Sequence, residues 1–391
     1  MFKKTLAAAA VLGAFAGSAF AADVTLYGVI DTGFSYVHSK TDGSDATDTF
    51  QMKAGQQSGT RFGLKGTEEL GNGMKVGFVL ENGFDADDGT FDANGDNRIF
   101  GREALLFVEG AFGHLGFGRD GQLAGGAGSY GIAGSNIHPF STGWGTVGGY
   151  STVFGATAAR FDNLITYKTP TFAGFTVFAQ YSMDGDTQDK ATLSSGVHGT
   201  ENKSTVNRYY GIGAQYKAGA AEVVAIVDSI NYASFNVDAA KHYADDSLSV
   251  TLGGNYNFGV AKLYVNGQYF DNAASMGKKN ALQWTASSKN AKGEMYGVDG
   301  YGFNIGADVP ALGGTAKVAF GYGHGEQDVV SGDKLELDTY IGTVGYIYNL
   351  SKRTAVYAAA DYIYGDYNKA AEANTKDQKV TEVIFGMTHK F

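Results

Sequence analysis

Cysteine is absent from the chain, and only 3 of its 391 residues are proline. The lack of cysteine excludes disulfide bridges, thiolate nucleophiles and thiolate metal sites. Long hydrophobic runs are missing too, because no stretch beyond the N-terminal leader approaches the roughly 18 consecutive apolar residues of a membrane-spanning helix. A bundle of membrane helices is therefore excluded. What the chain has instead is 58 Gly, 24 Tyr and 26 Phe, a composition that suits a long array of paired strands.

The N-terminus has the features of an export signal. Lys3 and Lys4 are followed by a short apolar stretch and by the small-residue site Ala19-Phe20-Ala21. This order is typical of a secretory signal peptide, and the apolar stretch is too short to span a membrane. We expect residues 1–21 to be removed, so that residues 22–391 form the exported chain.

Charge and motifs exclude several classes of function. The formal net charge of the whole chain is −10, and loss of Lys3 and Lys4 makes the mature chain more acidic still. Such a chain is a poor nucleic-acid binder, because phosphate contacts need clustered Lys and Arg. The seven His are scattered without an HExxH motif, and GxSxG is absent. Gly126–Gly131 fits GxGxxG, but the next twenty residues contain no Asp or Glu and no helical pattern follows. We therefore expect no enzyme activity, no metal and no cofactor.

Turn signals recur along the mature chain. Asn-Gly and Gly-Gly permit the positive φ of close hairpins, and strand-like runs flank each turn. Seven turns make eight segments, each long enough for two strands of about 10 residues and one longer loop. The pattern predicts 16 antiparallel strands, an even number that lets the first and last strands pair. The turns lie at Leu70–Gly73, Gly110–Gly113, Thr169–Gly174, Ala218–Ala220, Asn257–Gly259, Ala311–Gly314 and Leu350–Arg353.

The segments between turns alternate apolar and polar residues with the period of a strand. Between residues 75 and 81, one face carries Val, Phe and Leu and the other carries Lys and Glu. Between residues 160 and 168, one face carries Phe161, Ile165 and Tyr167 and the other carries Arg, Asp and Lys. A strand with one apolar and one charged face separates hydrocarbon from water. The alternation predicts an all-β transmembrane barrel, with a soluble β-sandwich or propeller as the alternative.

Several motifs share their order and spacing with one known family. The chain resembles the trimeric Gram-negative general-diffusion porins over essentially the whole mature sequence. The motifs that carry the resemblance are Val24–Asp31, Ser58–Gly66, Glu69–Gly73, Phe100–Ala104, Leu350–Thr354 and the terminal Phe391.

The resemblance implies a 16-stranded antiparallel barrel in the outer membrane of a Gram-negative bacterium. Such a barrel is a water-filled channel for passive diffusion of small hydrophilic solutes and ions. It forms a homotrimer, contacts membrane lipid and lipopolysaccharide, and is assembled by machinery that reads the terminal Phe391. The third loop folds into the lumen as a constriction loop, which the spacing places at residues 121–159.

The family's constriction opposes basic wall residues to acidic loop residues. By position, the basic cluster is expected at Arg61, Lys65, Arg102 and Arg160, and strand alternation independently supports all but Arg102. Arg98 and Arg119 are weaker candidates. Lumen placement is favoured, because an Arg facing lipid near the midplane costs about 2–4 kcal/mol.

The loop side departs from the family pattern. Residues 121–159 contain no Asp, Glu, Lys or Arg, and only Asp120 and Asp162 flank them. These two carboxylates are candidates for a partial acidic complement. An unbalanced basic cluster raises the local concentration of anions, so we expect a moderate anion preference. Much of the chain's acid lies in expected outer loops, for example at Asp85 and Asp88.

Four aromatic residues of the loop are compatible with two roles, sugar binding or anchoring of the loop to the wall. Tyr130, Phe140, Trp144 and Tyr150 would make a saccharide-preferring channel if they stacked on sugar faces. They would instead anchor the loop if they packed against the inner wall, and a buried loop needs such anchors. A non-conducting structural or adhesin barrel is a further alternative, although abundant Gly and Ala argue against a blocked lumen.

Overall fold

A computed structural model describes most of the mature chain. The expected signal peptide, residues 1–21, lies outside the described residues. The described residues are 24–91, 98–145, 147–155, 160–188, 199–234, 243–277, 282–330, 332–368 and 376–391.

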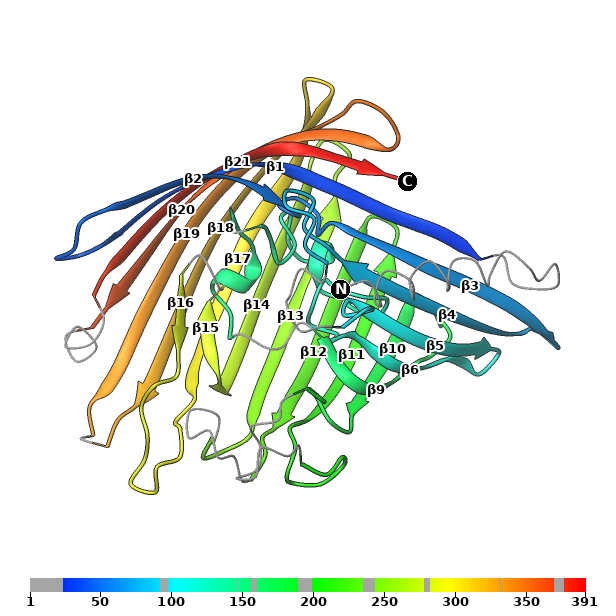
Figure 1. The fold of residues 1–391 in the computed structure, drawn as a ribbon, viewed down its shortest axis with the longest axis horizontal. Coiled ribbons are helices and arrows are strands. Elements are labelled where there is room, and N and C mark those ends of the chain that lie inside the picture. Colours follow the sequence, from blue (N-terminus) through cyan, green and yellow to red (C-terminus); the bar gives the residue numbers. More distant parts are fainter. Residues whose placement is uncertain are drawn as a thin grey trace.

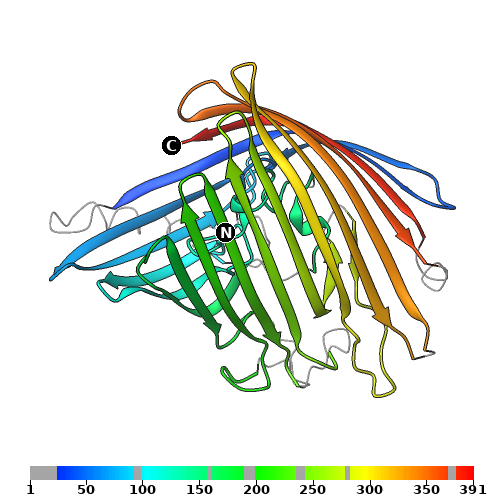
Figure 2. The same cartoon turned by 180° about the vertical axis from the view of Figure 1, so that it is seen from behind.

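The chain is all-β, and its strands curve into one closed antiparallel barrel (Figures 1 and 2). The barrel has sixteen strand positions, of which β2 and β3 together fill one. The barrel strands are β1 (Thr25–Thr41), β2 (Thr47–Ala54), β3 (Arg61–Gly71), β4 (Met74–Gly83), β5 (Glu103–Gly110), β6 (Gly113–Gly121), β9 (Arg160–Lys168), β10 (Phe175–Ser182), β11 (Arg208–Ala218), β12 (Ala221–Asn231), β13 (Ser247–Asn257), β14 (Lys262–Ala273), β17 (Val298–Ala311), β18 (Gly314–Asp328), β19 (Lys334–Asn349), β20 (Thr354–Tyr367) and β21 (Gln378–Lys390).

Closure occurs between the first and last strands. β1 pairs with β21 along a continuous register from Val29↔Lys390 to Thr41↔Gln378. The backbones of Gly28 and Phe391 exchange two hydrogen bonds of 3.1 Å at the end of this seam. β2 pairs with β1 alone, whereas every other barrel strand of the described chain has at least two paired neighbours, so the ring of strands is closed and spares its peptide groups an unpaired edge in hydrocarbon.

All seven predicted turns are confirmed as connections between neighbouring antiparallel strands. At the first of them, Gly71, Asn72 and Gly73 have φ of 85°, 52° and 72°. Asn and Gly adopt this left-handed region most readily, which is why the sequence signal was readable. The long connections leave the opposite ends of the strands, although the one between β18 and β19, residues 329–333, is as short as a turn.

Strand alternation places apolar side chains on the outer surface. Leu252, Val265 and Phe303 are half exposed on neighbouring strands. The residues that alternate with them along each strand are buried and face the lumen. The predicted alternation is wrong at one point in β9. Asn163 has a positive φ of 46°, and Phe161 is buried against Tyr209, at a ring-centroid distance of 4.1 Å. An irregularity in the pairing of β6 with β9 accompanies this change of face.

The longest described connection, between β6 and β9, lies inside the ring of strands (Figure 1). It contains two short 3₁₀-helices, η2 (Gly134–Asn136) and η3 (Tyr150–Thr152), and a small hairpin of β7 (Gly143–Trp144) and β8 (Val147–Gly148). None of the helices in the described part of the chain is long or apolar enough to cross a membrane.

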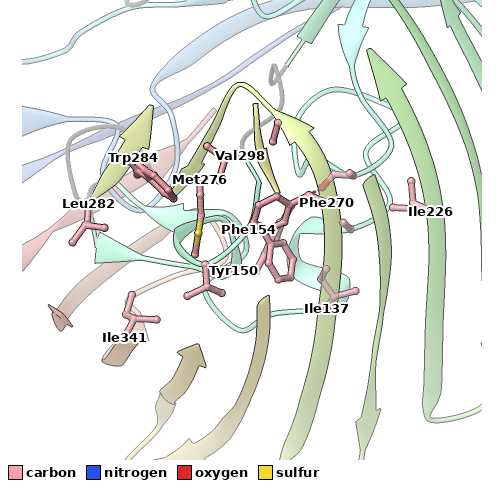
Figure 3. Close-up of a cluster of buried hydrophobic side chains, with 14 of the residues drawn as sticks. Ile137, Tyr150, Phe154, Ile226, Phe270, Met276, Leu282, Trp284, Val298 and Ile341 are labelled. Atoms are coloured by element: carbon pink, nitrogen blue, oxygen red, sulfur yellow. Dashed lines mark hydrogen bonds between the residues drawn. The ribbon is translucent and has the colours of Figure 1, made fainter. Parts of the chain in front are cut away.

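The connection between β14 and β17 also folds inward. It forms a hairpin of β15 (Ser275–Gly277) and β16 (Gln283–Thr285), and Gly277 donates its backbone N–H to the carbonyl of Phe154 in the constriction loop, at 3.0 Å. Met276 and Trp284 are buried with Phe154 in one apolar cluster (Figure 3). The lumen thus contains a hydrophobic core of its own, built where two loops meet the inner wall.

Candidate functional site

A cavity of about 1140 Å³ lies between one part of the inner wall and the constriction loop. The wall side comes mainly from β3, β4, β5 and the start of β9. The facing side is built from the constriction loop, whose glycine-rich stretch Gly125–Ser129 and hydroxyl residues Ser141, Thr142 and Ser151 line the cavity. The described part of the lumen therefore has a charged wall opposite an uncharged loop.

Four of the expected basic residues line this cavity: Arg61, Lys65, Arg102 and Arg160. Arg61 and Lys65 project from the same face of β3, four residues apart, because strand side chains alternate. Arg102 immediately precedes β5, and Arg160 opens β9. The Nε of Arg160 donates to the backbone oxygen of Arg102 at 2.6 Å, which ties the Arg160 guanidinium to the backbone just before β5.

Arg102 and Arg160 both line the cavity, and each uses the Nε of its guanidinium group for a contact with the protein. Arg102 uses Nε to contact Glu81, and Arg160 uses Nε to contact the Arg102 carbonyl. Among the described residues, the terminal nitrogens of both groups make no hydrogen bond or ion pair. A guanidinium fork of this kind matches the geometry of carboxylate and other oxyanions.

Glu81 and Glu103 are the acidic members of this wall, and the sequence analysis did not identify them. Glu81 accepts from Nε of Arg102 at 2.7 Å and lies 3.3 Å from Nε of Arg61. Glu103 accepts a hydrogen bond from the Ser129 hydroxyl of the loop. Alternation had placed Glu81 on the polar face, but its position opposite Gly63, between Arg61 and Lys65, follows only from the strand register.

Arg119 does not line the cavity. Its Nε donates to the carbonyl of Gly101, and one terminal nitrogen contacts Asp162 at 2.7 Å. Arg98 also contacts Asp162, at 2.8 Å, and contacts Asp186 at the same distance. Asp162 therefore belongs to an ion-pair network beside the cavity.

Asp120 is buried and holds the base of the constriction loop. Its carboxylate accepts backbone N–H bonds from Gly121 at 2.5 Å and Ser129 at 3.1 Å. Gly128 allows this contact, because its φ is 69° and a Cβ there would overlap Asp120. Neither Asp120 nor Asp162 is among the residues that line the cavity, so the acidic complement comes from the wall.

The four loop aromatics are buried, each at most 4 % exposed. Phe140 and Trp144 pack edge to face at 5.2 Å, and Trp144 packs on Tyr357 of β20 at 5.8 Å. Tyr150 donates to the carbonyl of Ala124 at 2.8 Å. Burial raises the pKa of Tyr150, which keeps this donor protonated. Although Trp144 and Tyr150 reach the cavity wall, their rings pack the loop rather than face solvent as open stacking surfaces.

Tyr130 is tied to the wall by its hydroxyl. His114 of β6 lies 2.6 Å from that oxygen, and the imidazole stacks on Phe107 at 4.6 Å. No three metal-ligating side chains converge anywhere in the described ranges. The charged side chains that line the cavity can attract charged solutes.

Comparisons with known proteins agree with this geometry. A family model described as Gram-negative porin matches residues 7–380. An outer membrane porin protein of Bordetella pertussis is 33% identical, over 100% of both chains. Outer membrane porin protein 32 of Delftia acidovorans is 31% identical, over 91% of this chain and 88% of its own. An anion-selective porin from Comamonas acidovorans has a similar solved structure, with a TM-score of 0.65 and 25% identity over 95% of this chain and 100% of its own.

Proposed function

The chain belongs to the Gram-negative porin family and is a passive diffusion channel of the outer membrane, and we propose that its pore favours small anions over cations. The observation that carries the proposal is the charge of the cavity lining. Among the described residues, five basic side chains line the cavity against three acidic ones. Arg61, Lys65, Arg102 and Arg160 lie on the wall already described, with Glu81 and Glu103 beside them.

The arrangement of these charges matters as much as their number. Within the described ranges the terminal nitrogens of Arg102 and Arg160 have no partner, whereas Glu81 is engaged by Arg61 and Arg102. The loop across the cavity contributes no charged side chain, so no acidic surface cancels the field of the wall. A narrow aqueous space beside a basic wall concentrates anions and repels cations.

The net charge of −10 does not oppose this proposal. Acidic side chains such as Asp85 and Asp88 lie in the long connection between β4 and β5, outside the cavity lining. Fields from exposed charges are screened within about 10 Å at 0.1 M salt. The groups beside the conduction path therefore dominate selectivity. The anion selectivity of the solved Comamonas porin supports the same direction.

We also propose that the channel is a homotrimer that contacts outer-membrane lipid and lipopolysaccharide and is inserted by the barrel-assembly machinery. The outer surface near the seam is apolar, with Phe34 stacked on Phe50 at 5.7 Å and close to Phe385 at 5.4 Å. Phe391 ends on this seam, where its backbone pairs with Gly28, a position that suits a C-terminal assembly signal. The size of the folded species in detergent, measured by light scattering, tests the trimer.

Two other functions have weaker support. A saccharide-preferring channel needs open aromatic faces, whereas Phe140 and Tyr150 are buried. A non-conducting structural barrel needs a filled lumen, whereas a cavity of about 1140 Å³ remains beside the constriction loop.

The proposal is tested by the reversal potential of the refolded mature chain in a planar bilayer under a KCl gradient. We expect a chloride-to-potassium permeability ratio above one. Arg61→Ala and Arg160→Ala should each lower this ratio, and the double variant Arg102→Ala/Arg160→Ala should lower it further, because each removes a cation from the cavity wall.

The matched control is Arg353→Ala, which removes the same charge from an exposed short turn. This variant should keep the ratio of the unmodified channel. A permeability ratio below one for the unmodified channel would refute the anion preference, and equal ratios in all variants would refute the role of the arginine cluster.

A further inference from the structure

A second pair of opposite charges lines the cavity on another part of the wall. Lys317 of β18 donates to the carboxylate of Asp308 on neighbouring β17, at 2.8 Å. Both side chains are partly buried and both line the cavity. Asp308 also accepts a hydrogen bond from the Tyr264 hydroxyl at 2.9 Å, which fixes its orientation.

Lys317 and the arginine cluster lie at different depths in the pore. Lys317 is the fourth residue of β18 and follows directly on the Ala311–Gly314 turn. Arg61 and Arg160 are the first residues of β3 and β9, and both strands reach a short turn only at their other ends. Because strands rise about 3.3 Å per residue, Lys317 lies nearer than Arg61 and Arg160 to the short-turn end of the barrel.

Lys317 also holds the constriction loop. Its ammonium donates a second hydrogen bond, of 3.0 Å, to the carbonyl of Pro139. It lies 5.9 Å from the ring centroid of Trp144, within the range of a cation–π contact.

Two wall amides hold the preceding loop carbonyls. Asn255 donates to the carbonyl of Asn136, and Asn266 donates to that of Ile137, each at 2.7 Å. Three strands thus supply one donor each to this short stretch of loop. Lys317 is the one among these three donors that carries a charge and borders the cavity.

We propose that Lys317 is a positioning and specificity-determining residue, which fixes the tip of the constriction loop and forms with Asp308 a second charge-selective station in the pore. The two roles are separable because they use different partners of one ammonium group. The bond to Pro139 sets where the loop lies, and the pairing with Asp308 sets the local charge. The expected changes in permeability ratio rest on the proposed diffusion of ions through this cavity. The positioning of the loop by Lys317 does not.

The charge role predicts opposite effects for the two partners. Lys317→Met leaves the Asp308 carboxylate without its cation, so the chloride-to-potassium permeability ratio should fall roughly twofold. Asp308→Asn leaves Lys317 uncompensated, so the ratio should rise by a similar factor. The double variant removes both charges and should return close to the unmodified ratio.

The positioning role predicts a different grouping of the same variants. Lys317→Met and the double variant both lose the donor to Pro139, so both should show more open-channel current noise than the unmodified channel. Asp308→Asn keeps that donor and should remain quiet. Lys317→Arg keeps a charged donor, which should restore most of the ratio and reduce the noise.

The experiment is single-channel recording of the full mature chain with these four variants, under a KCl gradient for the ratio and in symmetric KCl for the noise. A folded-barrel band in an unboiled detergent gel shows that each variant has refolded. Lys75→Met is the matched control, because Lys75 pairs with Glu69 at 3.1 Å near another short turn but does not line the cavity. This control should match the unmodified channel in both measurements.

Each result bears on one part of the inference. A double variant as far from the unmodified ratio as Lys317→Met would overturn the paired station. Noise in Lys317→Met no greater than in the control would overturn the positioning role. Because these are differences between variants, they stand even if the unmodified channel proves cation-preferring, and that result would refute only the anion preference proposed above.

Discussion

The two halves of the barrel lumen are built on opposite principles. On the side of β3, β4, β5 and β9, ionised side chains line an open cavity. On the side of β11 to β20, the constriction loop and the β15–β16 hairpin fill the space with buried apolar residues such as Phe154, Phe270 and Met276 (Figure 3). Charged side chains thus dominate one part of the wall, and apolar packing dominates the other apart from the Lys317–Asp308 pair that also lines the cavity.

This difference explains why a loop without charged residues suits the constriction. The loop packs against the wall through buried aromatic rings. Its backbone carbonyls and N–H groups form hydrogen bonds with side chains of the wall. A charged side chain at one of those buried positions would need a partner, because an unpaired buried charge is costly. In the proposed channel, the charged side chains of the wall therefore determine ion selectivity, and the packing of the loop determines the width of the pore.

The largest effect should come from breaking the packed half. Phe140→Ala removes a ring that is fully buried against Trp144, and such truncations cost about 3–5 kcal/mol. The chain's two tryptophans, Trp144 and Trp284, are both buried in this half, so their fluorescence reports its integrity. We expect their emission to shift to longer wavelength at lower urea concentration than in the unmodified chain.

Phe172→Ala is the control for this prediction. Phe172 is 81 % exposed in a short turn, so its loss leaves the loop packing intact. Equal urea midpoints for Phe140→Ala and Phe172→Ala would show that the loop is held by its hydrogen bonds and not by its aromatic anchors.

A charge placed on the packed side should remove the contrast between the halves. Ala127 lies in the glycine-rich stretch that lines the cavity opposite the arginines. Ala127→Asp should therefore lower the chloride-to-potassium permeability ratio several-fold, since a carboxylate there offsets the basic wall. Ala127→Asn has nearly the same shape and no charge, and should leave the ratio close to that of the unmodified channel. A shift of equal size in both variants would mean that loop shape, rather than charge, controls selectivity.

High salt should weaken the electrostatic field of the charged half and leave the apolar packing of the other half unchanged. The Debye length falls from about 10 Å at 0.1 M to about 3 Å at 1 M, so the field of the arginine wall should be largely screened at the higher concentration. We expect the permeability ratio, measured at the same tenfold gradient, to approach the ratio of free diffusion as mean KCl rises. The tryptophan emission of the packed half should not change over this range. Full selectivity retained at 1 M would point to tight individual binding sites.

Local sequence signals were sufficient for the framework of the barrel. Each short turn depends on a few adjacent residues, as Gly71, Asn72 and Gly73 show, and strand alternation depends on the neighbouring positions alone. Both could be predicted without any knowledge of tertiary contacts. Phe161 was placed on the wrong face because Asn163 adopts a positive φ within β9, and a single Asn inside a strand does not show that the strand changes face there.

The site was less predictable because it depends on register and on long-range packing. The positions of Arg61, Lys65, Arg102 and Arg160 followed from a family resemblance, and the structure brings all four to one cavity. The pairing of Glu81 with two of them needs the alignment of β3 with β4.

The contacts within the packed half were even harder to predict from the sequence. The contact between Met276 and the constriction loop joins residues more than a hundred positions apart. Hydrophobic patterning within either loop gives no indication of the other loop as its partner.

The smallest effect should come from a change at Glu81. It distinguishes whether this carboxylate acts on selectivity through its charge or by holding the neighbouring guanidinium groups. Glu81→Gln removes one acid from the cavity lining, so the permeability ratio should rise by roughly twofold if the carboxylate acts mainly through its charge. If its contacts with Arg61 and Arg102 mainly hold the guanidinium groups in place, the ratio should instead fall as they spread apart. We expect the rise, because Arg61 also donates to Gly59 at 2.6 Å and is not held by Glu81 alone. Glu69→Gln, an exposed acid outside the cavity, should leave the ratio unchanged.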